Sequence, residues 1–261
     1  MKVFARGQRI AALPERDRLL GSEAKVSSTR SAVPNVLALT LQDRTHTESA
    51  KVVLGQAVVA GWTGRDPIAV EKHIRELEAL GVKRPMATPI FYRVSASRLT
   101  TEDTIEAVGE SSGGEVEFVL LQHNDQLWVG TGSDHTDREV EKCGVTISKQ
   151  MCEKPMASVF WAYNDVAAHW DRLTLRAHVA AGGTRTLYQE GAVSAMMHPM
   201  ELIARHAGDR SLPEGTIMFC GTFAAHGGVR PTPEFAFELE DPVLGRKIAH
   251  AYRVRTLPIL G

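Results

Sequence analysis

The order of apolar and polar positions divides the chain into short segments with strand-like or helix-like periodicity. From Leu37 to Leu41 every second side chain is a leucine, which is the period of a half-buried β-strand. A continuous apolar run over residues 52–59 predicts a second strand, buried on both faces. The sequence GWTGRDP follows this run, and its glycines predict the end of the strand.

A helix is predicted directly after these glycines. Asp66 is a favourable N-cap, and Pro67 fits the first turn because its missing N–H is not needed there. Gly81 is a natural stop at the C-terminal end. The apolar stripe of this helix is Val70, Ile74, Leu77 and Leu80. This spacing predicts an amphipathic helix with one face on the core.

The rest of the chain is rich in β-prone segments. Helical patterns return only around residues 164–170 and 199–206. The β-prone runs are 90–94, 115–121, 127–129, 172–179, 216–220, 235–240 and 247–257. We find no internal repeat, no regular alternation of strand and helix, and no glycine-rich phosphate loop. The pattern predicts an α+β protein built on a mixed or antiparallel sheet.

Composition places the chain among ordinary globular proteins of one or two domains. It has 261 residues, and 30 Lys plus Arg against 31 Asp plus Glu leave a formal net charge of -1. This balance gives no reason to expect nucleic acid or a membrane as a partner. The three cysteines fit a reducing compartment, and no leader-like apolar run opens the chain, so we expect a cytoplasmic protein. Residues 1–35 show no clear period and are predicted to form an irregular arm.

Acidic residues supply the first candidate chemistry. Glu115 and Glu117 are two positions apart, so in a strand they share one face at a spacing of roughly 7 Å. Either both side chains point toward one bound cation, or they lie on the solvent-exposed face of an edge strand. Asp134 lies in the polar segment GSDHTDREVE, which is either part of a site or a solvated turn before a charged helix. Together the three carboxylates form an all-oxygen ligand set suited to Mg²⁺, Mn²⁺ or Ca²⁺.

Two further candidates are basic side chains. His73 and Glu76 are three positions apart on the predicted helix, so the carboxylate can orient the imidazole as a general base. The alternative is a solvated helix face with ordinary i,i+4 ion pairs. Lys149 offers an ammonium group for an oxyanion or a carboxylate, although most lysines are merely solvated.

The order of these motifs resembles the fumarylacetoacetate hydrolase superfamily from about Gly61 to the C-terminus, and is most similar to a bacterial branch of it. The matching segments are His73 to Glu76, Pro89 to Arg93, Glu115 with Glu117, Asp134 with Arg138, Lys149, Gln189-Glu190-Gly191 and Gly221-Thr222-Phe223. The resemblance implies a mixed β-sheet roll. It also implies an arm and small β-rich region over residues 1–60, and a catalytic domain over 61–261.

The resemblance also implies a role for each matched residue. Glu115, Glu117 and Asp134 would bind Mg²⁺, Mn²⁺ or Ca²⁺, while His73 with Glu76 would activate water and Lys149 would hold the substrate. Further substrate contacts would come from Arg93, Arg138, Gln189, Gly221 and Thr222. Arg93 stands where the superfamily has lysine, Phe223 where it has proline, and Thr216 where aspartate is usual. These departures leave the substrate open.

The expected function is that of a divalent-metal-dependent hydrolase. It would cleave a carbon–carbon bond in a small oxo or dioxo carboxylic acid, similar to an acylpyruvate, through a metal-stabilised enolate. The alternatives on the same site are a decarboxylase, hydratase or tautomerase of a 2-oxo acid. A different class is a metabolite-binding homologue without turnover. The superfamily's habit of pairing favours a homodimer.

Overall fold

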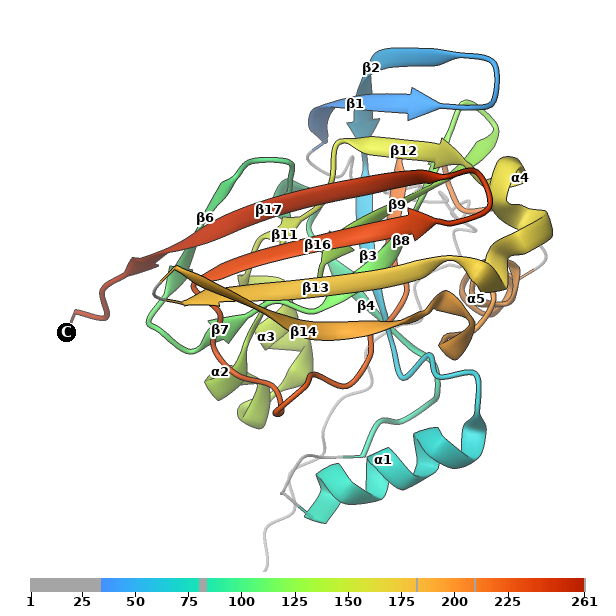
Figure 1. Cartoon of the computed structure of the whole chain (residues 1–261). Helices are drawn as coiled ribbons and strands as arrows, with labels where there is room; N and C mark the ends of the chain where they lie inside the picture. Colours follow the sequence, from blue (N-terminus) through green and yellow to red (C-terminus); the bar gives the residue numbers. More distant parts are fainter. Residues whose placement is uncertain (1–33, 80–83, 182, 209, 261) are drawn as a thin grey trace, which may run out of the picture. The chain divides into compact units, whose positions relative to one another are not determined.

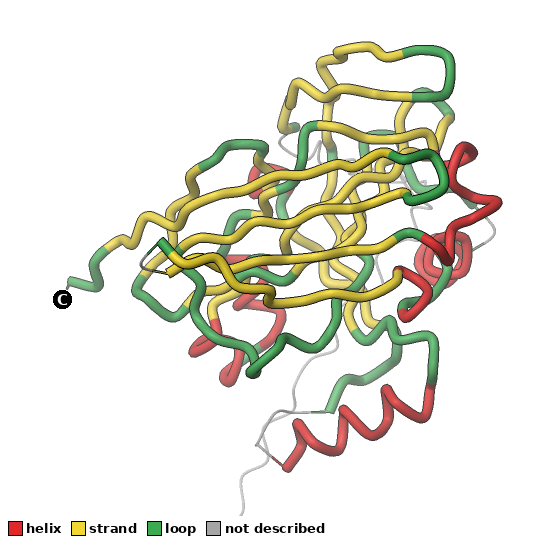
Figure 2. Tube along the Cα trace, viewed as in Figure 1, coloured by secondary structure: helices red, strands yellow, loops and turns green. Residues whose placement is uncertain are grey.

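The computed structural model describes residues 34–79, 84–181, 183–208 and 210–260, which belong to one compact unit, Ala32–Gly261. The predicted arm over residues 1–35 lies outside the described residues except for its last two positions. Two large sheets and five short α-helices make up the described part (Figures 1 and 2). No described helix is long and apolar enough to span a membrane. The fold is α+β, as the periodicity predicts.

The larger sheet has eight strands and mixed direction. In spatial order these are β2 (Thr47–Leu54), β1 (Asn35–Gln42), β12 (Val159–Ala162), β9 (Gln126–Ser133), β8 (Val116–His123), β15 (Thr216–Phe219), β3 (Gln56–Gly61) and β4 (Ile90–Val94). The pairs β1–β12 and β3–β15 are parallel, and the other neighbours are antiparallel. Since β3 crosses residue 60, strands on both sides of the expected domain boundary share this sheet.

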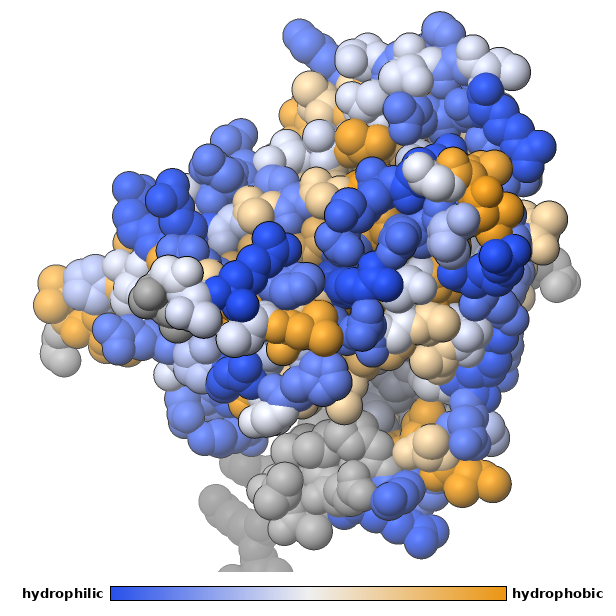
Figure 3. Space-filling view, viewed as in Figure 1, coloured by the Kyte–Doolittle hydropathy of each residue, from blue (hydrophilic) through white to orange (hydrophobic). Residues whose placement is uncertain are grey.

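The second sheet has five strands. In spatial order these are β14 (Thr184–Ala192), β13 (Thr174–Ala181), β16 (Glu234–Asp241), β17 (Arg246–Leu257) and β6 (Thr104–Val108). Its outer face carries a network of charges in which Arg176 pairs with Glu190, Glu238 and Glu240. Figure 3 shows mainly hydrophilic residues on the corresponding side of the molecule. This face is therefore the solvated one.

Helices, 3₁₀ turns and two small ladders lie between the strands of the two sheets along the chain. The helices are α1 (Pro67–Ala79), α2 (Arg138–Cys143), α3 (Val145–Met151), α4 (Tyr163–Val166) and α5 (Pro199–Ala207), and the 3₁₀ turns are η1 (Ala96–Arg98), η2 (Ala167–Arg172) and η3 (Val193–Ala195). Two small ladders pair β10 (Thr136–Asp137) with β7 (Ser112–Gly113), and β11 (Lys154–Pro155) with β5 (Leu99–Thr100).

The eight-stranded sheet is buried on both faces. On one face, Phe118 and Leu120 of β8 pack in a cluster with Phe235 and Phe237 of the five-stranded sheet. On the other face, Val119 belongs to a second cluster that includes side chains from both β2 and β4, the edge strands of the curled sheet. Double burial explains why β8 reads as a continuous apolar run. We call the surface that carries Val119 the second face.

Most predicted elements are confirmed, with two informative differences. The amide N–H of Ile68 donates to Asp66 Oδ1 at 2.9 Å, so Asp66 does cap α1. The apolar run over 52–59 is two strands, because β2 ends at Leu54 and β3 begins at Gln56. Strand β14 escaped prediction because, as an edge strand, it leaves most of its side chains exposed and lacks a clear apolar period.

Candidate active site

Three carboxylates meet where β8 begins and β9 ends. Val116 pairs with Ser133, and the amide N–H of Asp134 donates to the carbonyl oxygen of Glu115 at 2.9 Å, so Glu115 and Asp134 are cross-strand neighbours. Glu117 is two positions from Glu115 and therefore lies on the same face of β8. The hairpin joining β8 and β9 is short, which fixes this register locally.

Burial of the three carboxylates is unequal. Asp134 is fully buried and Glu117 is 2% exposed, whereas 15% of the Glu115 side chain is exposed. Glu117 and Val119 are two positions apart in β8, so Glu117 lies on the second face with Val119. Glu115 and its cross-strand neighbour Asp134 lie on the same face. The site is thus a buried acidic group that reaches solvent beside Glu115.

Three cations surround this acidic group. Lys149 of α3 forms a short ion pair with Asp134 Oδ2, and its Nζ lies 4.0 Å from Glu115 Oε2. Lys154 of β11 is fully buried, lies 3.1 Å from Asp134 Oδ1, and donates to the carbonyl oxygen of His135 at 2.5 Å. Arg138 Nη2 lies 3.5 Å from Glu115 Oε2. Asp134 is therefore held between two ammonium groups.

The surroundings drive the pKa values of two neighbouring carboxyls apart. Burial alone would raise the pKa of Asp134, but Lys149 and Lys154 lower it to about 2. Burial and the nearby charge of Asp134 raise the pKa of Glu117 well above its usual range. The ion pairs formed by the described residues reach Asp134 and Glu115 but not Glu117. Glu117 is thus the one of the three carboxyls that forms no ion pair with a described cation.

The chemistry of the donors fits a hard divalent cation. Glu115, Glu117 and Asp134 offer only oxygen ligands, and a cation beside Glu117 would stabilise its charged form. Within the described part of the chain, however, no three His, Cys, Asp or Glu side chains are already gathered closely enough to form a metal cluster. Binding would therefore require Asp134 to share its oxygens between the ion and its lysine partners.

Gln189 and Thr222, both expected to contact substrate, form hydrogen bonds that hold the start of β8. Gln189 Oε1 accepts from the N–H of Val116 at 3.0 Å, and its Nε2 donates to Thr222 Oγ1 at 2.8 Å. The Thr222 hydroxyl in turn donates to the carbonyl oxygen of Val116 at 2.7 Å. These bonds fix the backbone between Glu115 and Glu117.

Gly221 brings a backbone donor to the acidic group. Its N–H donates to Glu117 Oε2 at 2.7 Å, and its φ of 102° is rarely adopted by residues with side chains. A Cβ at this position would lie 1.8 Å from Thr63 Oγ1. Only glycine therefore lets this loop approach Glu117.

Replacing Gly221 by alanine should lower the free energy of unfolding by about 3 kcal/mol or more, since backbone strain adds to a steric clash. Gly183→Ala is the matched control. Gly183 also has a positive φ, of 79°, but a Cβ added there would have no atom within 4 Å, so strain of about 1–2 kcal/mol is expected alone. Urea unfolding of both variants measures the difference. Equal losses would show that the approach to Thr63 is not constrained.

The remaining expected site residues lie away from the acidic group or outside the described residues. Arg93 pairs with Val58, which belongs to the first cluster, so it lies on the opposite face from the carboxylates. Its guanidinium bonds to Gln56 and to the carbonyl oxygen of Gly55. The structure does not bring Arg93 to the acidic group. His73 and Glu76 lie on α1, but their side chains are outside the described residues.

Lys154 is the main site residue that the sequence does not reveal. It follows Glu153 in the segment CEKP, where a charged pair suggests a surface turn. Its burial results from the pairing of β11 with β5, more than fifty residues earlier in the chain. No local period signals such a contact.

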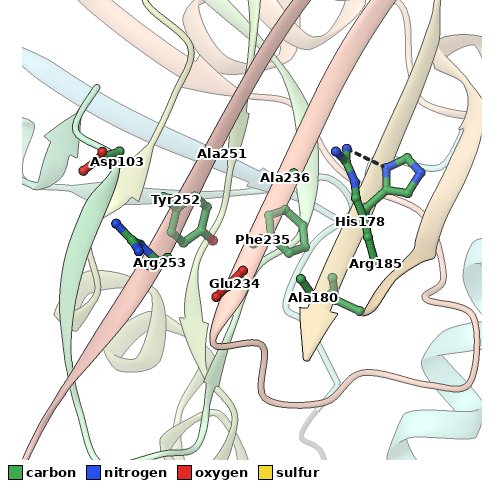
Figure 4. Close-up of a pocket in the computed structure, with 11 residues that line it drawn as sticks. Asp103, His178, Ala180, Arg185, Glu234, Phe235, Ala236, Ala251, Tyr252 and Arg253 are labelled. Atoms are coloured by element: carbon green, nitrogen blue, oxygen red, sulfur yellow. Dashed lines mark hydrogen bonds between the residues drawn. The ribbon is translucent and has the colours of Figure 1, made fainter. Parts of the chain in front are cut away.

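A separate hollow of about 320 Å³ lies on the five-stranded sheet and contains none of the three carboxylates. Figure 4 shows Arg185 and His178 on one side of this hollow and Asp103 and Arg253 on the other. Arg185 Nη2 lies 3.3 Å from His178 Nδ1. Both acidic and basic residues line this hollow, so its charge does not favour a ligand of one sign.

Comparison with solved structures shows which proteins share this fold. A yeast fumarylacetoacetate hydrolase family protein, ynq8, is 18% identical, with a TM-score of 0.57 over 79% of this chain and 95% of that one. The fumarylacetoacetate hydrolase of the psychrophilic Exiguobacterium antarcticum is 16% identical, with a TM-score of 0.55 over 77% and 75%. A 2-keto-3-deoxy-D-arabinonate dehydratase complexed with magnesium and 2,5-dioxopentanoate is 14% identical, with a TM-score of 0.55 over 82% and 78%.

Sequence comparison gives the family. No curated protein matches the chain significantly. A family model described as "Protein of unknown function (DUF2848)" matches residues 60–252, which include all the expected site residues. The chain therefore belongs to this DUF2848 family, and its fold is the fumarylacetoacetate hydrolase fold that the motif order implies.

Proposed function

We propose that this chain is a divalent-metal-dependent enzyme acting on a small oxo or dioxo carboxylic acid. The reaction we favour is hydrolysis of a carbon–carbon bond in an acylpyruvate-like substrate. The observation that supports it is the buried acidic group of Glu115, Glu117 and Asp134, with Lys149 beside it. Oxygen ligands next to an ammonium group suit a metal that chelates an anionic substrate.

The charges around the acidic group also favour an anionic ligand. Arg138 is shared between Glu115 and Glu141, so four carboxylates face three cations. Because Glu117 favours its protonated form, the local charge is close to zero before a metal binds. A divalent ion that displaces this proton would make the local charge positive. A substrate carboxylate with an adjacent oxo group would then be attracted to the site.

In this proposal each group of the site has a distinct role. Mg²⁺, when bound by Glu115, Glu117 and Asp134, supplies a Lewis-acid charge next to the substrate oxygens. Lys149 places a second positive charge at the same oxygens, because it is 7% exposed and thus reachable from solvent, whereas Lys154 is enclosed. His73 with Glu76 is the proposed base that removes a proton from water.

The dehydratase complexed with magnesium and 2,5-dioxopentanoate supports both the metal and the ligand class, as a protein of the same fold. It also keeps a hydratase or dehydratase reaction as the second candidate. Decarboxylation and tautomerisation use the same activated oxo acid. We further propose that the protein is a homodimer.

The test is turnover of acylpyruvates, oxaloacetate and 2-keto-3-deoxy sugar acids by chelator-treated protein, with and without added Mg²⁺. Lys149→Met should lower kcat/KM by about 100-fold or more, because it removes a charge at the reacting oxygens. Lys142→Met is the matched control, since Lys142 is 67% exposed and pairs only with Glu139 among the described residues. Metal and oxo-acid binding without turnover of any substrate would instead favour a metabolite-binding protein.

A further inference from the structure

Tyr92 lies on the same face of the eight-stranded sheet as the three carboxylates. It pairs with Val59 of β3, which pairs with Phe219 of β15, which in turn pairs with Val119 of β8. Residues in one such row project to the same side of a sheet. Val119 is two positions from Glu117, so Tyr92 belongs to the second face.

The Tyr92 ring covers the adjacent Gly61. A Cβ on Gly61 would lie 3.0 Å from Tyr92 Cε2, so the missing side chain makes room for the ring. Gly61 pairs with Ile90, the next row toward the Glu117 end of the sheet. The ammonium of Lys149 lies 6.0 Å from the centre of the Tyr92 ring. Tyr92 therefore lies beside the cation that contacts Asp134.

The hydroxyl of Tyr92 has a defined hydrogen-bond direction. Trp62, whose indole N–H can only donate, lies next to this hydroxyl and acts on its pKa as a side-chain donor. The Tyr92 oxygen is therefore the acceptor, and its own proton remains available. In the part of the chain that the structure describes, no hydrogen bond donated by the Tyr92 hydroxyl is found. Burial raises the pKa of Tyr92, so the hydroxyl stays protonated near neutral pH.

Trp62 is held in an unusual backbone conformation. Its φ is 60°, in the left-handed region that bulky residues rarely adopt. Such strain persists only where the surroundings impose it, and it is concentrated at functional sites. Here it places a tryptophan directly after Gly61, in contact with Tyr92.

We propose that Tyr92 is a substrate-contacting residue whose hydroxyl donates a hydrogen bond to an oxygen of the oxo acid beside Lys149. Trp62 is then a positioning residue, because its N–H takes up a lone pair of the Tyr92 oxygen and so directs the hydroxyl proton elsewhere. This inference rests on the proposed function. It adds a neutral donor, fixed in direction, to the positive charge of Lys149. A neutral phenol can discriminate between oxygen positions, whereas a flexible ammonium group discriminates less.

The test is calorimetric titration of oxalate, a small anion with adjacent oxygens, into Mn²⁺-loaded protein. Tyr92→Phe keeps the ring and removes the hydroxyl, so oxalate affinity should fall about 10-fold or more while Mn²⁺ affinity stays within about twofold. Trp62→Phe should lower oxalate affinity by a smaller factor. Tyr163→Phe is the matched control, because Tyr163 is similarly buried, donates or accepts a bond with His198, and packs on the opposite face.

The outcomes separate this inference from the proposed function. Unchanged oxalate affinity in Tyr92→Phe, with Mn²⁺ binding intact in the wild type, overturns the role of Tyr92 alone. Loss of Mn²⁺ binding in Tyr92→Phe, with an unchanged melting temperature, also overturns it, because the residue would then act on the metal site. A wild-type protein that binds neither Mn²⁺ nor oxalate overturns the proposed function and this inference together.

Discussion

Asp134→Asn should lower the free energy of unfolding by about 3–5 kcal/mol, the cost of leaving a buried charge without its partner. Asparagine can accept a hydrogen bond from only one of the two lysines, and its NH₂ group would face the other ammonium. Because Lys154 is fully buried, water cannot replace the lost carboxylate oxygen. Urea unfolding in the presence of a chelator measures this effect without a contribution from bound metal.

An exposed ion pair provides the control for this prediction. Asp171 pairs with Arg65 at 2.8 Å, but 58% of its side chain is exposed. Asp171→Asn should therefore cost less than about 1 kcal/mol. If the two variants lose equal stability, the burial of Lys149 and Lys154 does not require the charge of Asp134.

The carboxylate of Asp134 should also make the free energy of unfolding depend on pH. The pKa of Asp134 falls from an ordinary 3.8 to about 2 in the folded protein. A lowered pKa contributes stability above the unfolded value, and the contribution is lost as pH falls through the folded value. About 2 kcal/mol should thus disappear between pH 4 and pH 2 in the wild type. This loss should be absent from Asp134→Asn.

That Glu115, Glu117 and Asp134 share one face can be predicted from the sequence because the strand contacts between them are local. Glu115 and Glu117 share a face by strand period, and a short hairpin carries the chain to Asp134. Lys149 lies fifteen residues beyond Asp134, within reach of the same hairpin end. The carboxylates and their first cation therefore follow from patterns that span less than forty residues.

Residues placed by a strand pairing that no local sequence pattern signals are harder to predict. Tyr92 reaches the second face because β4 pairs with β3, and Lys154 because β11 pairs with β5. Arg93, the next residue of β4, shows how strongly the face of a side chain depends on strand register. Arg93 was expected to bind substrate, but one position along a strand reverses the face, and it bonds to Gln56 instead. A family motif can therefore align correctly along the strand and still leave open which of two neighbouring side chains faces the carboxylates.

Glu117→Gln is expected to separate metal binding from stability. Since burial and Asp134 already favour the protonated form of Glu117, glutamine is close to it in charge and shape. It can still accept the hydrogen bond from the N–H of Gly221. The melting temperature of the chelator-treated protein should therefore stay the same or rise. Mn²⁺ affinity should fall about 100-fold or more, because an anionic ligand is lost.

Proton release gives an independent measure of the same role. A metal can bind Glu117 only after its proton leaves, so Mn²⁺ affinity of the wild type should rise with pH toward the raised pKa of Glu117. Calorimetry in two buffers of different ionisation enthalpy should count about one more proton released by the wild type than by Glu117→Gln. Glu201→Gln, which alters an exposed pair with Arg205, should behave as the wild type. Equal proton release by the wild type and Glu117→Gln would exclude Glu117 as a metal ligand, because a ligand with a raised pKa must lose its proton to bind.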